Sequence, residues 1–520
     1  MLSDFRRLDS RVDLDFDVCI VGAGPAGITL AREIGGGRMR VCLLESGGLE
    51  PEAELVDLNA GENVGLDLFD LRVARQRFLG GASNHWGGWC APLDPDDFEG
   101  RDWVPYSGWP IRRADLDPYY ERAQLICDLG TWRYDESLWS ELGRAGLPFD
   151  GSRLVTRFWQ FSGGRSYDRS TRFGVKYRSV LEASVDVHVF LYANVIELRS
   201  NREGNRIESV DAVALDGTAR RIRARWYVLA AGAIENARLL LASNRVEAHG
   251  IGNRHDLVGR FFMEHPRATV GEVWSRQGRK LLETYDYCPF GKTDVLPGIA
   301  TSPRLTQEKR ILSGCMTLLD EVGPGQSMRA TSALDFEDLL QVRRDLEPPA
   351  PEPPPRRASR PDQSESTGIW IVVRSEQAPS PDSRITLSQE RDAAGQRRVR
   401  LDLRFSPQDK RTLRVMAETL GAELGRLGMG RVWLAEVFRR SDDDWSGVPG
   451  LRVGFHHMGT TRMADDPRKG VVDADCRVHG IANLYVTGSS VFVTGGWANP
   501  TLTVVALALR LAAHLKRIAS

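Results

Sequence analysis

Cysteine is sparse in this sequence of 520 residues, and its seven cysteines form no C-x-x-C pair. The low density and odd count indicate free thiols in a reducing compartment rather than a disulfide framework. No apolar run approaches the ~20 residues that a membrane-spanning helix needs. The arginines near the N-terminus are followed by no apolar stretch, unlike a secretory signal. These absences predict a soluble cytoplasmic protein with no membrane span.

A charge excess of one sign is also lacking, because the formal net charge is -1. This argues against a strongly basic nucleic-acid surface, so we expect no nucleic acid among the partners. No cluster of residues has the spacing of a metal site, and the adjacent His456 and His457 alone cannot supply three or four ligands. The length exceeds the ~250–300 residues of a single core, so about two domains are expected.

The clearest motif is a glycine-rich turn between a strand and a helix. Residues 17–21 (DVCIV) have the β-branched pattern of a buried strand, and GAGPAG and the helical stretch ITLAREI follow. A second strand at residues 40–44 ends at Glu45, which lies 45 − 22 = 23 residues after Gly22. In such a unit the glycines let a pyrophosphate approach the helix N-terminus, and the acid binds a ribose. The pattern predicts a dinucleotide site, FAD or NAD, that uses Gly22, Gly24, Pro25, Ala26, Gly27 and Glu45.

Further elements follow from local patterns. Residues 226–231 (WYVLAA) predict a buried strand that turns at Gly232 into a helix, and residues 187–200 and 483–486 predict more sheet. A long helix is expected after Asn499-Pro500, with asparagine as N-cap and proline at the first helical position. The proline-rich residues 345–366 exclude a helix or central strand, so we expect a surface loop, with a substrate lid or oligomer contact as the alternative.

Four separated stretches resemble the glucose–methanol–choline (GMC) family of FAD-dependent oxidoreductases. They are VGAGPAG with Glu45, FLGGASNHWGG at residues 78–88, HHMGTTRM at residues 456–463, and VDADCRVHGIANLYVTGSSVF with NPTLT. They occur in family order and cover nearly the whole chain. The SNHWGG stretch and the Asn-Pro ending look more like the branch of pyranose oxidases and bacterial glycoside 3-oxidases than like glucose oxidase.

The resemblance implies an α/β fold in which a Rossmann-like FAD-binding domain is interleaved with a substrate domain built on a β-sheet flanked by helices. It assigns residues 10–95, 185–265 and 450–520 to the FAD domain, and residues 96–184 and 266–449 to the substrate domain. It also implies further cofactor-binding residues: Gly80, Gly81, Ser83, His85, Trp86, Gly87, Val195, Ala231, Gly232, Gly488, Ser489, Asn499, Pro500 and Thr501.

Three departures from the family pattern limit what can be carried over. The histidine similar to His85 is covalently bound to the flavin in pyranose oxidases, but Asn84 stands here where those enzymes have threonine. We therefore predict noncovalent FAD. The turn at residues 487–489 lacks the family's aspartate, and Val493 stands where proline is usual, so specificity carried by these loops cannot be transferred.

The family's catalytic histidine precedes Gly-Thr as His-x-x-Gly-Thr, which selects His456 as the base. If this stretch is an extended strand, adjacent residues point to opposite faces, so His456 and His457 cannot both face the flavin. His457 falls where the family accepts varied residues, and it is therefore interpreted as a residue that packs or supports the site. In the family, the position of Asn499 partners this base, and an N-cap role is the structural alternative. His265 and His479 are interpreted as structural.

The resemblance implies oxidation of an alcohol to a carbonyl, with hydride transfer to flavin N5, and favours a sugar or glycoside hydroxyl. The electron acceptor would be oxygen or a quinone, and an oligomer is possible. The alternatives are an FAD-containing lyase with no net redox chemistry, similar to hydroxynitrile lyases, an oxidase of a non-sugar alcohol, and an FAD-stabilised binding protein.

Overall fold

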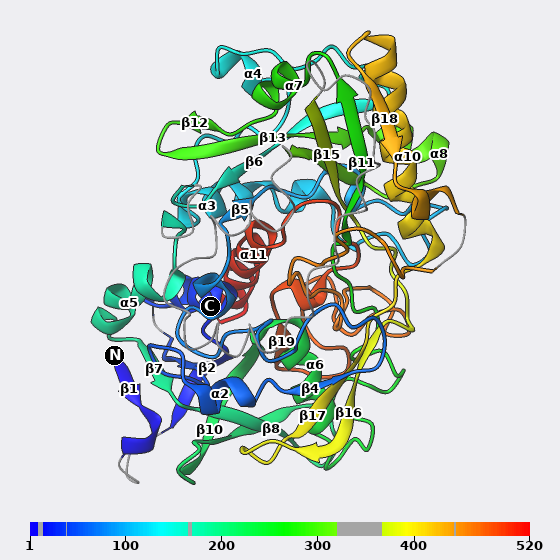
Figure 1. Cartoon of the computed structure of the whole chain (residues 1–520). Helices are drawn as coiled ribbons and strands as arrows, with labels where there is room; N and C mark the ends of the chain where they lie inside the picture. Colours follow the sequence, from blue (N-terminus) through cyan, green and yellow to red (C-terminus); the bar gives the residue numbers. More distant parts are fainter. Residues whose placement is uncertain (9–13, 38, 165–168, 320–366, 441–443, 520) are drawn as a thin grey trace.

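Two large β-sheets organise the chain, one in the lower half and one in the upper half of Figure 1. The computed structural model describes residues 1–8, 14–37, 39–164, 169–319, 367–440 and 444–519. The predicted proline-rich loop at residues 345–366 lies outside these described residues. The α/β class expected from the sequence is confirmed.

Within the described part of the chain, the first sheet has eight strands in the order β1-β7-β3-β2-β10-β9-β8, with β19 also paired to β10. The strands β1, β7, β3, β2, β10 and β19 pair in parallel. Strand β9 pairs antiparallel with β10 and with β8. Their bounds are β1 Leu2–Asp4, β2 Asp15–Val21, β3 Val41–Leu44, β7 Val187–Leu191, β8 Asn194–Ser200, β9 Ile207–Val213, β10 Ala219–Leu229 and β19 Leu484–Val486.

The strands predicted from β-branched runs are present in this sheet, with one difference. The predicted sheet segment at residues 187–200 is two strands, β7 and β8, which belong to different parts of the sheet. Tyr192 lies between them with φ of 63°, a left-handed conformation that ends β7. A break of this kind has no signal in a pattern of β-branched residues.

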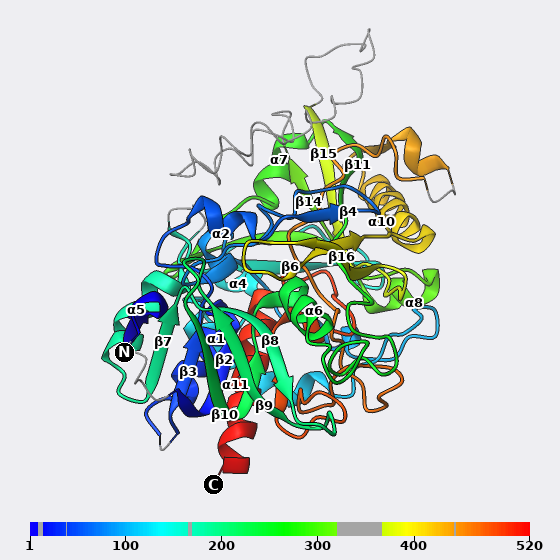
Figure 2. The ribbon, with the colours of Figure 1, turned by 90° about the horizontal axis from the view of Figure 1, so that it is seen from below.

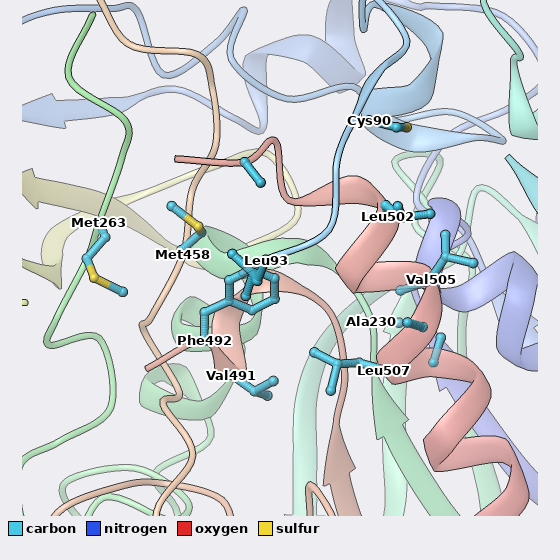
Figure 3. Close-up of a cluster of buried hydrophobic side chains, with 14 of the residues drawn as sticks. Cys90, Leu93, Ala230, Met263, Met458, Val491, Phe492, Leu502, Val505 and Leu507 are labelled. Atoms are coloured by element: carbon cyan, nitrogen blue, oxygen red, sulfur yellow. The ribbon is translucent and has the colours of Figure 1, made fainter. Parts of the chain in front are cut away.

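Helices α1 (Pro25–Ile34) and α11 (Thr501–Ala519) pack against each other beside the parallel strands, as seen in Figure 2. The buried side chains of Leu502, Val505 and Leu507 on α11 are drawn in Figure 3, close to Ala230 at the end of β10. Burying each such side chain contributes roughly 1.5–3 kcal/mol, so α11 holds its place mainly by apolar packing. Among the described helices, none is long and apolar enough to cross a membrane.

The glycine-rich turn joins β2 to α1 and depends on two of its glycines. Gly22 has φ of 102°, and a Cβ there would lie 2.8 Å from the carbonyl oxygen of Ala230. A Cβ at Gly27 would collide with the carbonyl oxygen of Gly22. Only residues without side chains allow the helix and the two strands to approach this closely.

The second sheet is antiparallel, and within the described residues its order is β18-β11-β15-β14-β13-β6-β5, with β12 paired to β13. Its strands are β5 Trp89–Cys90, β6 Leu154–Phe161, β11 Arg267–Ser275, β12 Cys288–Phe290, β13 Thr293–Thr301, β14 Gly314–Leu319, β15 Thr367–Ser375 and β18 Arg431–Leu434. Helix α10 (Pro407–Arg426) packs on this sheet. A small sheet of β16 (Arg384–Arg391), β17 (Arg397–Asp402) and β4 (Gly61–Asn63) lies beside α6 (Gly232–Ala242).

We propose that the two large sheets mark the two predicted domains. The strands of the first sheet come from the N-terminal, central and C-terminal parts of the chain, which agrees with a discontinuous cofactor domain. Strand β5, which falls in the segment 10–95 assigned to that domain, pairs with β6 of the second sheet. The proposed boundary after residue 95 therefore lies a few residues beyond the change of sheet.

All seven cysteines are buried, free thiols. This confirms the prediction of free cysteines from their number and spacing. They are spread over both sheets and the loops between them, so the fold depends on apolar packing and backbone hydrogen bonds.

Candidate active site

A cavity of about 480 Å³ lies between the two sheets, and segments from both line its wall. It extends from the glycine-rich turn after β2 to a polar group around His456 and Asn499. Most of the predicted cofactor-binding residues line it: Gly22, Gly24, Pro25, Ala26, Glu45, Gly81, Ser83, His85, Trp86, Gly87, Val195, Ala231, Gly232, Gly488, Ser489, Asn499, Pro500 and Thr501. Their role in binding stays a prediction.

Two of the predicted cofactor-binding glycines, Gly27 and Gly80, are not part of the cavity wall. Gly27 lies where α1 crosses the turn, so its small size serves packing. Gly80 has φ of 103°, and a Cβ there would lie 2.7 Å from the backbone nitrogen of Gly174. Both positions require glycine for close backbone approach rather than for contact with a ligand.

The end of the cavity near the glycine-rich turn has the donor set of a dinucleotide site. Glu45 directly follows β3 and accepts hydrogen bonds from the backbone N–H of Ala23 (3.0 Å) and Gly47 (3.1 Å). Burial raises the pKa of the Glu45 carboxyl, while these N–H groups favour its charged form. A Cβ built at Gly24, Gly232 or Gly488 would meet no other atom within 4 Å, so the space beside these bare backbones is open. The residues present therefore fit an extended dinucleotide.

Residues 78–88 cover the middle of the cavity. The His85 ring lines it, and its Nδ1 lies 3.0 Å from Nε2 of Gln76. The Ser83 hydroxyl donates to the carbonyl of Gly80 and accepts from the backbone N–H of Phe173, so it shapes the turn. The Trp86 indole N–H donates to the backbone of Thr171. This segment thus fixes its own turn while presenting His85 to the cavity.

The other end of the cavity holds a chain of short polar contacts between residues from four separate parts of the chain. Nε2 of His456 lies 3.1 Å from Nδ2 of Asn499. The Asn499 Oδ1 accepts a hydrogen bond of 3.2 Å from Nη1 of Arg374, at the end of β15. On the other side of the ring, Nδ1 of His456 lies 2.7 Å from Nδ1 of His265. The two residues that the sequence paired, His456 and Asn499, are brought together.

The side chain of Asn499 is used by this chain of contacts and not as a helix cap. Helix α11 begins at Thr501, and the carbonyl of Pro500 accepts the N–H of Val504. The predicted N-cap role of Asn499 is therefore wrong. The reason is that Arg374 and His456 occupy both polar atoms of its amide.

No partner of His265 could be read from the sequence, but the structure places one, His456, in the candidate site. The interpretation of His265 as a structural residue stays a prediction. This side chain is fully buried, just before β11, and contacts His456 directly. Its Nε2 lies 2.8 Å from the carbonyl oxygen of Gly496. The preceding residue, Glu264, accepts the backbone N–H of His456 at 2.9 Å. Both residues hold the loop that carries the catalytic candidate.

The two adjacent histidines do not lie on a strand, so the argument from strand alternation does not apply. Phe455 before them has φ of 55°, and both imidazoles line the cavity. The His457 ring stacks on Phe69 at 5.4 Å between centroids, and its Nε2 lies 3.4 Å from Oε1 of Glu264. These contacts are those of a packed residue, as its predicted role requires.

Burial sets the protonation states of this group. It holds the pKa of His456 well below its ordinary value, and the nearby cation of Arg374 also disfavours a proton there. Burial also lowers the pKa of His265 to about 4, and raises that of Glu264 to about 8. Arg374 remains a cation at neutral pH, because burial and the neighbouring Arg267 lower its pKa only to about 10.

The sequence analysis missed Arg374, Arg267 and Glu264. Arg267 and Arg374 are paired across β11 and β15, and both line the cavity. A signal existed for Arg374, since it directly follows the apolar run GIWIVV of β15. Glu264 adjoins His265 in the sequence, but no local pattern gives either residue its contact with the loop of His456. His479, also interpreted as structural, has its Nε2 2.8 Å from the carbonyl oxygen of Ala464.

This fold and site define a class of protein. Residues 379–508 match the family model of the GMC oxidoreductases, in its C-terminal domain. These residues form a GMC oxidoreductase C-terminal domain, so the resemblance seen in the motifs is confirmed for this part of the chain. The match and the relatives described next support an alcohol oxidoreductase. Proteins of this family are flavoproteins that generally bind FAD.

Known relatives extend the similarity beyond the C-terminal domain. The chain is 28% identical to the 6'''-hydroxyparomomycin C oxidase of Streptomyces lividus, covering 97% of this chain and 92% of that protein. It is 27% identical to a C-glycoside 3-oxidase of Microbacterium trichothecenolyticum over 58% of this chain and 48% of that protein. A fungal aryl-alcohol oxidase has a similar fold, with a TM-score of 0.57 at 14% identity, over 98% of this chain and 100% of that one.

Proposed function

We propose that the protein oxidises a hydroxyl group of a sugar or glycoside to a carbonyl, with FAD as its cofactor. The observation that carries this proposal is the 3.1 Å contact between Nε2 of His456 and Nδ2 of Asn499 at one end of a cavity whose other end holds Glu45 and the glycine-rich turn. The proposed base, its hydrogen-bond donor and the proposed dinucleotide site would therefore share one cavity.

The residues of the cavity divide into two tasks. Glu45 would bind the adenosine ribose, and the N-terminus of α1 would face the pyrophosphate. FAD, when bound, supplies the acceptor for the hydride that leaves the alcohol carbon. Neutral His456 would accept the hydroxyl proton at Nε2, and Asn499 would orient the hydroxyl and stabilise the charge that develops on its oxygen. The N-terminus of α11 would favour negative charge nearby.

The cation of Arg374 favours a neutral sugar over an amino sugar. It donates to Asn499, so it lies close to where the reacting hydroxyl would bind. A protonated amine on the substrate would meet this charge in a buried site, where like charges repel strongly. The relatives of this chain include both aminoglycoside and glycoside oxidases. Of the two, we propose a glycoside without amino groups as the substrate class of this protein.

An anaerobic screen tests the function. The FAD-bound protein is mixed with neutral sugars, glycosides, amino sugars and polyols, and the visible absorbance of the flavin is recorded. We expect neutral glycosides to bleach it. If an accepted substrate is converted with no bleaching at any stage, the chain is a lyase of the same fold. Admitting air or a quinone after bleaching then identifies the electron acceptor.

Glu45→Ala is expected to weaken FAD binding about tenfold to hundredfold, because hydrogen bonds to a charged group contribute roughly 1.5–3 kcal/mol. The Kd of FAD is measured by quenching of flavin fluorescence, with the exposed Glu54→Ala as the matched control. The order of preference among alcohols should not change. An FAD affinity equal to that of the control would remove Glu45 from the ribose site.

FAD is expected to be held without a covalent bond. Asn84 departs from the pattern of the enzymes with a flavin-linked histidine, and Nδ1 of His85 is in contact with Gln76. After precipitation with acid, the pellet should be colourless and the supernatant yellow. A yellow pellet with a clear supernatant would show instead that His85 or another residue carries the flavin.

A further inference from the structure

The contacts around His456 form a single line of groups whose two ends each allow only one hydrogen-bonding role. At one end Arg374 can only donate, because a guanidinium has no acceptor. At the other end the backbone carbonyl of Gly496 can only accept. Between them lie Asn499, His456 and His265, at distances of 2.7–3.2 Å between successive polar atoms.

These ends determine every proton between them. Arg374 donates to Oδ1 of Asn499, which turns the Nδ2 group of the amide toward Nε2 of His456. The carbonyl of Gly496 accepts from Nε2 of His265, so Nδ1 of the neutral His265 ring is an acceptor. The proton between the two Nδ1 atoms must then belong to His456. Its Nε2 is left with a lone pair directed at Asn499 and the cavity.

We propose that His265 and Arg374 are positioning residues that fix His456 as the Nδ1–H tautomer and Asn499 with its amide N–H toward the cavity. This inference rests on the proposed function, in which Nε2 of His456 is the base. All four hydrogen bonds run in the same direction, from Arg374 to Gly496, and such chains strengthen each other. Neither residue touches the reacting hydroxyl in this scheme, since each acts through the pair.

Four groups face His456 from the elements packed around it. They are His265 and Glu264 before β11, Arg374 on β15, and His457 in the same loop. The two histidines are neutral at pH 7, and Glu264 has its pKa raised to about 8 by burial. Arg374 is thus the charged neighbour whose removal would favour a proton on His456.

The sign of the pH effect follows from this charge. His456 is active when unprotonated, and a cation nearby lowers its pKa, so flavin reduction should fall only at pH values well below 6.5. Arg374→Met removes the cation and the donor. We expect its flavin reduction to be about tenfold slower at neutral pH. In the profile of this rate against pH, the acid limb, where the rate falls as His456 is protonated, should move up by roughly one pH unit. Arg374→Lys keeps a cation and a donor, so the acid limb of its pH profile should lie at the same pH as in the unsubstituted protein.

The tautomer is measured separately from activity. In FAD-bound protein labelled with ¹⁵N-histidine, the signal of His456, assigned with His456→Ala, should show a protonated Nδ1 and an unprotonated Nε2. His265→Leu removes the acceptor, so the signal should change to the other tautomer or to a mixture. His265→Asn offers a carbonyl oxygen in its place, and should restore the first tautomer.

The results separate this inference from the proposed function. If no alcohol reduces the flavin, the proposed function fails, and the ¹⁵N spectrum still decides the arrangement of protons. The inference is overturned if His456 carries its proton on Nε2 in the unchanged protein, or if Arg374→Met and Arg374→Lys have the same acid limb. If His265→Leu does not fold, the pH profiles of the two Arg374 variants and the ¹⁵N spectrum of the unsubstituted protein still decide the question.

Discussion

His456→Ala is expected to slow anaerobic reduction of the flavin by about 10²–10⁴-fold while FAD stays bound, which is the loss typical of a missing general base. The imidazole is the proposed acceptor of the hydroxyl proton, and its Nε2 lies at the cavity beside Asn499. The position of His456 is not among those proposed to hold the adenosine or the pyrophosphate. Rapid mixing with a reducing substrate measures the rate, and the visible spectrum measures the bound flavin.

The adjacent His457 provides the matched control. Its ring stacks on Phe69 and lies close to Phe262, and its Nε2 faces Glu264. His457→Ala removes packing and should slow the reaction much less than His456→Ala. A larger loss at His457, or a small loss at His456, would mean that the base has been assigned to the wrong histidine.

Asn499→Ala is expected to slow flavin reduction by about 10²–10³-fold, the loss typical when one donor to a developing oxyanion is removed. The amide is held between Arg374 and His456, so its N–H is preorganised for the reacting oxygen. Because this role concerns the transition state, we expect the limiting rate to fall more than the affinity for the alcohol changes. Single-turnover reduction over a range of substrate concentrations separates the two.

Asn499→Asp is the sharper variant, because it keeps the shape and replaces the N–H donor with an acceptor. It should be at least as slow as Asn499→Ala. A negative charge beside His456 would also favour its protonated form and move the acid limb of the rate to higher pH. If Asn499→Asp reduces the flavin as fast as the unchanged protein, the side chain is not the donor that we propose.

The sequence by itself determined the parts of this protein that depend on neighbours in the chain. The turn from β2 to α1 needs glycine at Gly22 and Gly27 for steric reasons, and Glu45 follows at the end of the next strand. The apolar patterns of the sequence predicted β2, β3, β10 and α11. They do so because burial of one or both faces of a strand or helix requires apolar residues at a regular spacing. The catalytic candidate, His456, was selected by the resemblance, because it stands before Gly459-Thr460 as the family's histidine does.

Only the tertiary structure decided what surrounds that candidate. His265 and Arg374 lie 191 and 82 positions away from His456 in the chain, and no local pattern predicts which side chains will face one another across such separations. The helix starts at Thr501 rather than at Pro500, the predicted first helical position. Arg374 and His456 bind the Asn499 amide that could have capped α11. Phe455 has a positive φ and both histidines after it line the cavity, whereas on a strand they would point to opposite faces. In each case long-range hydrogen bonding and burial overrode a local preference.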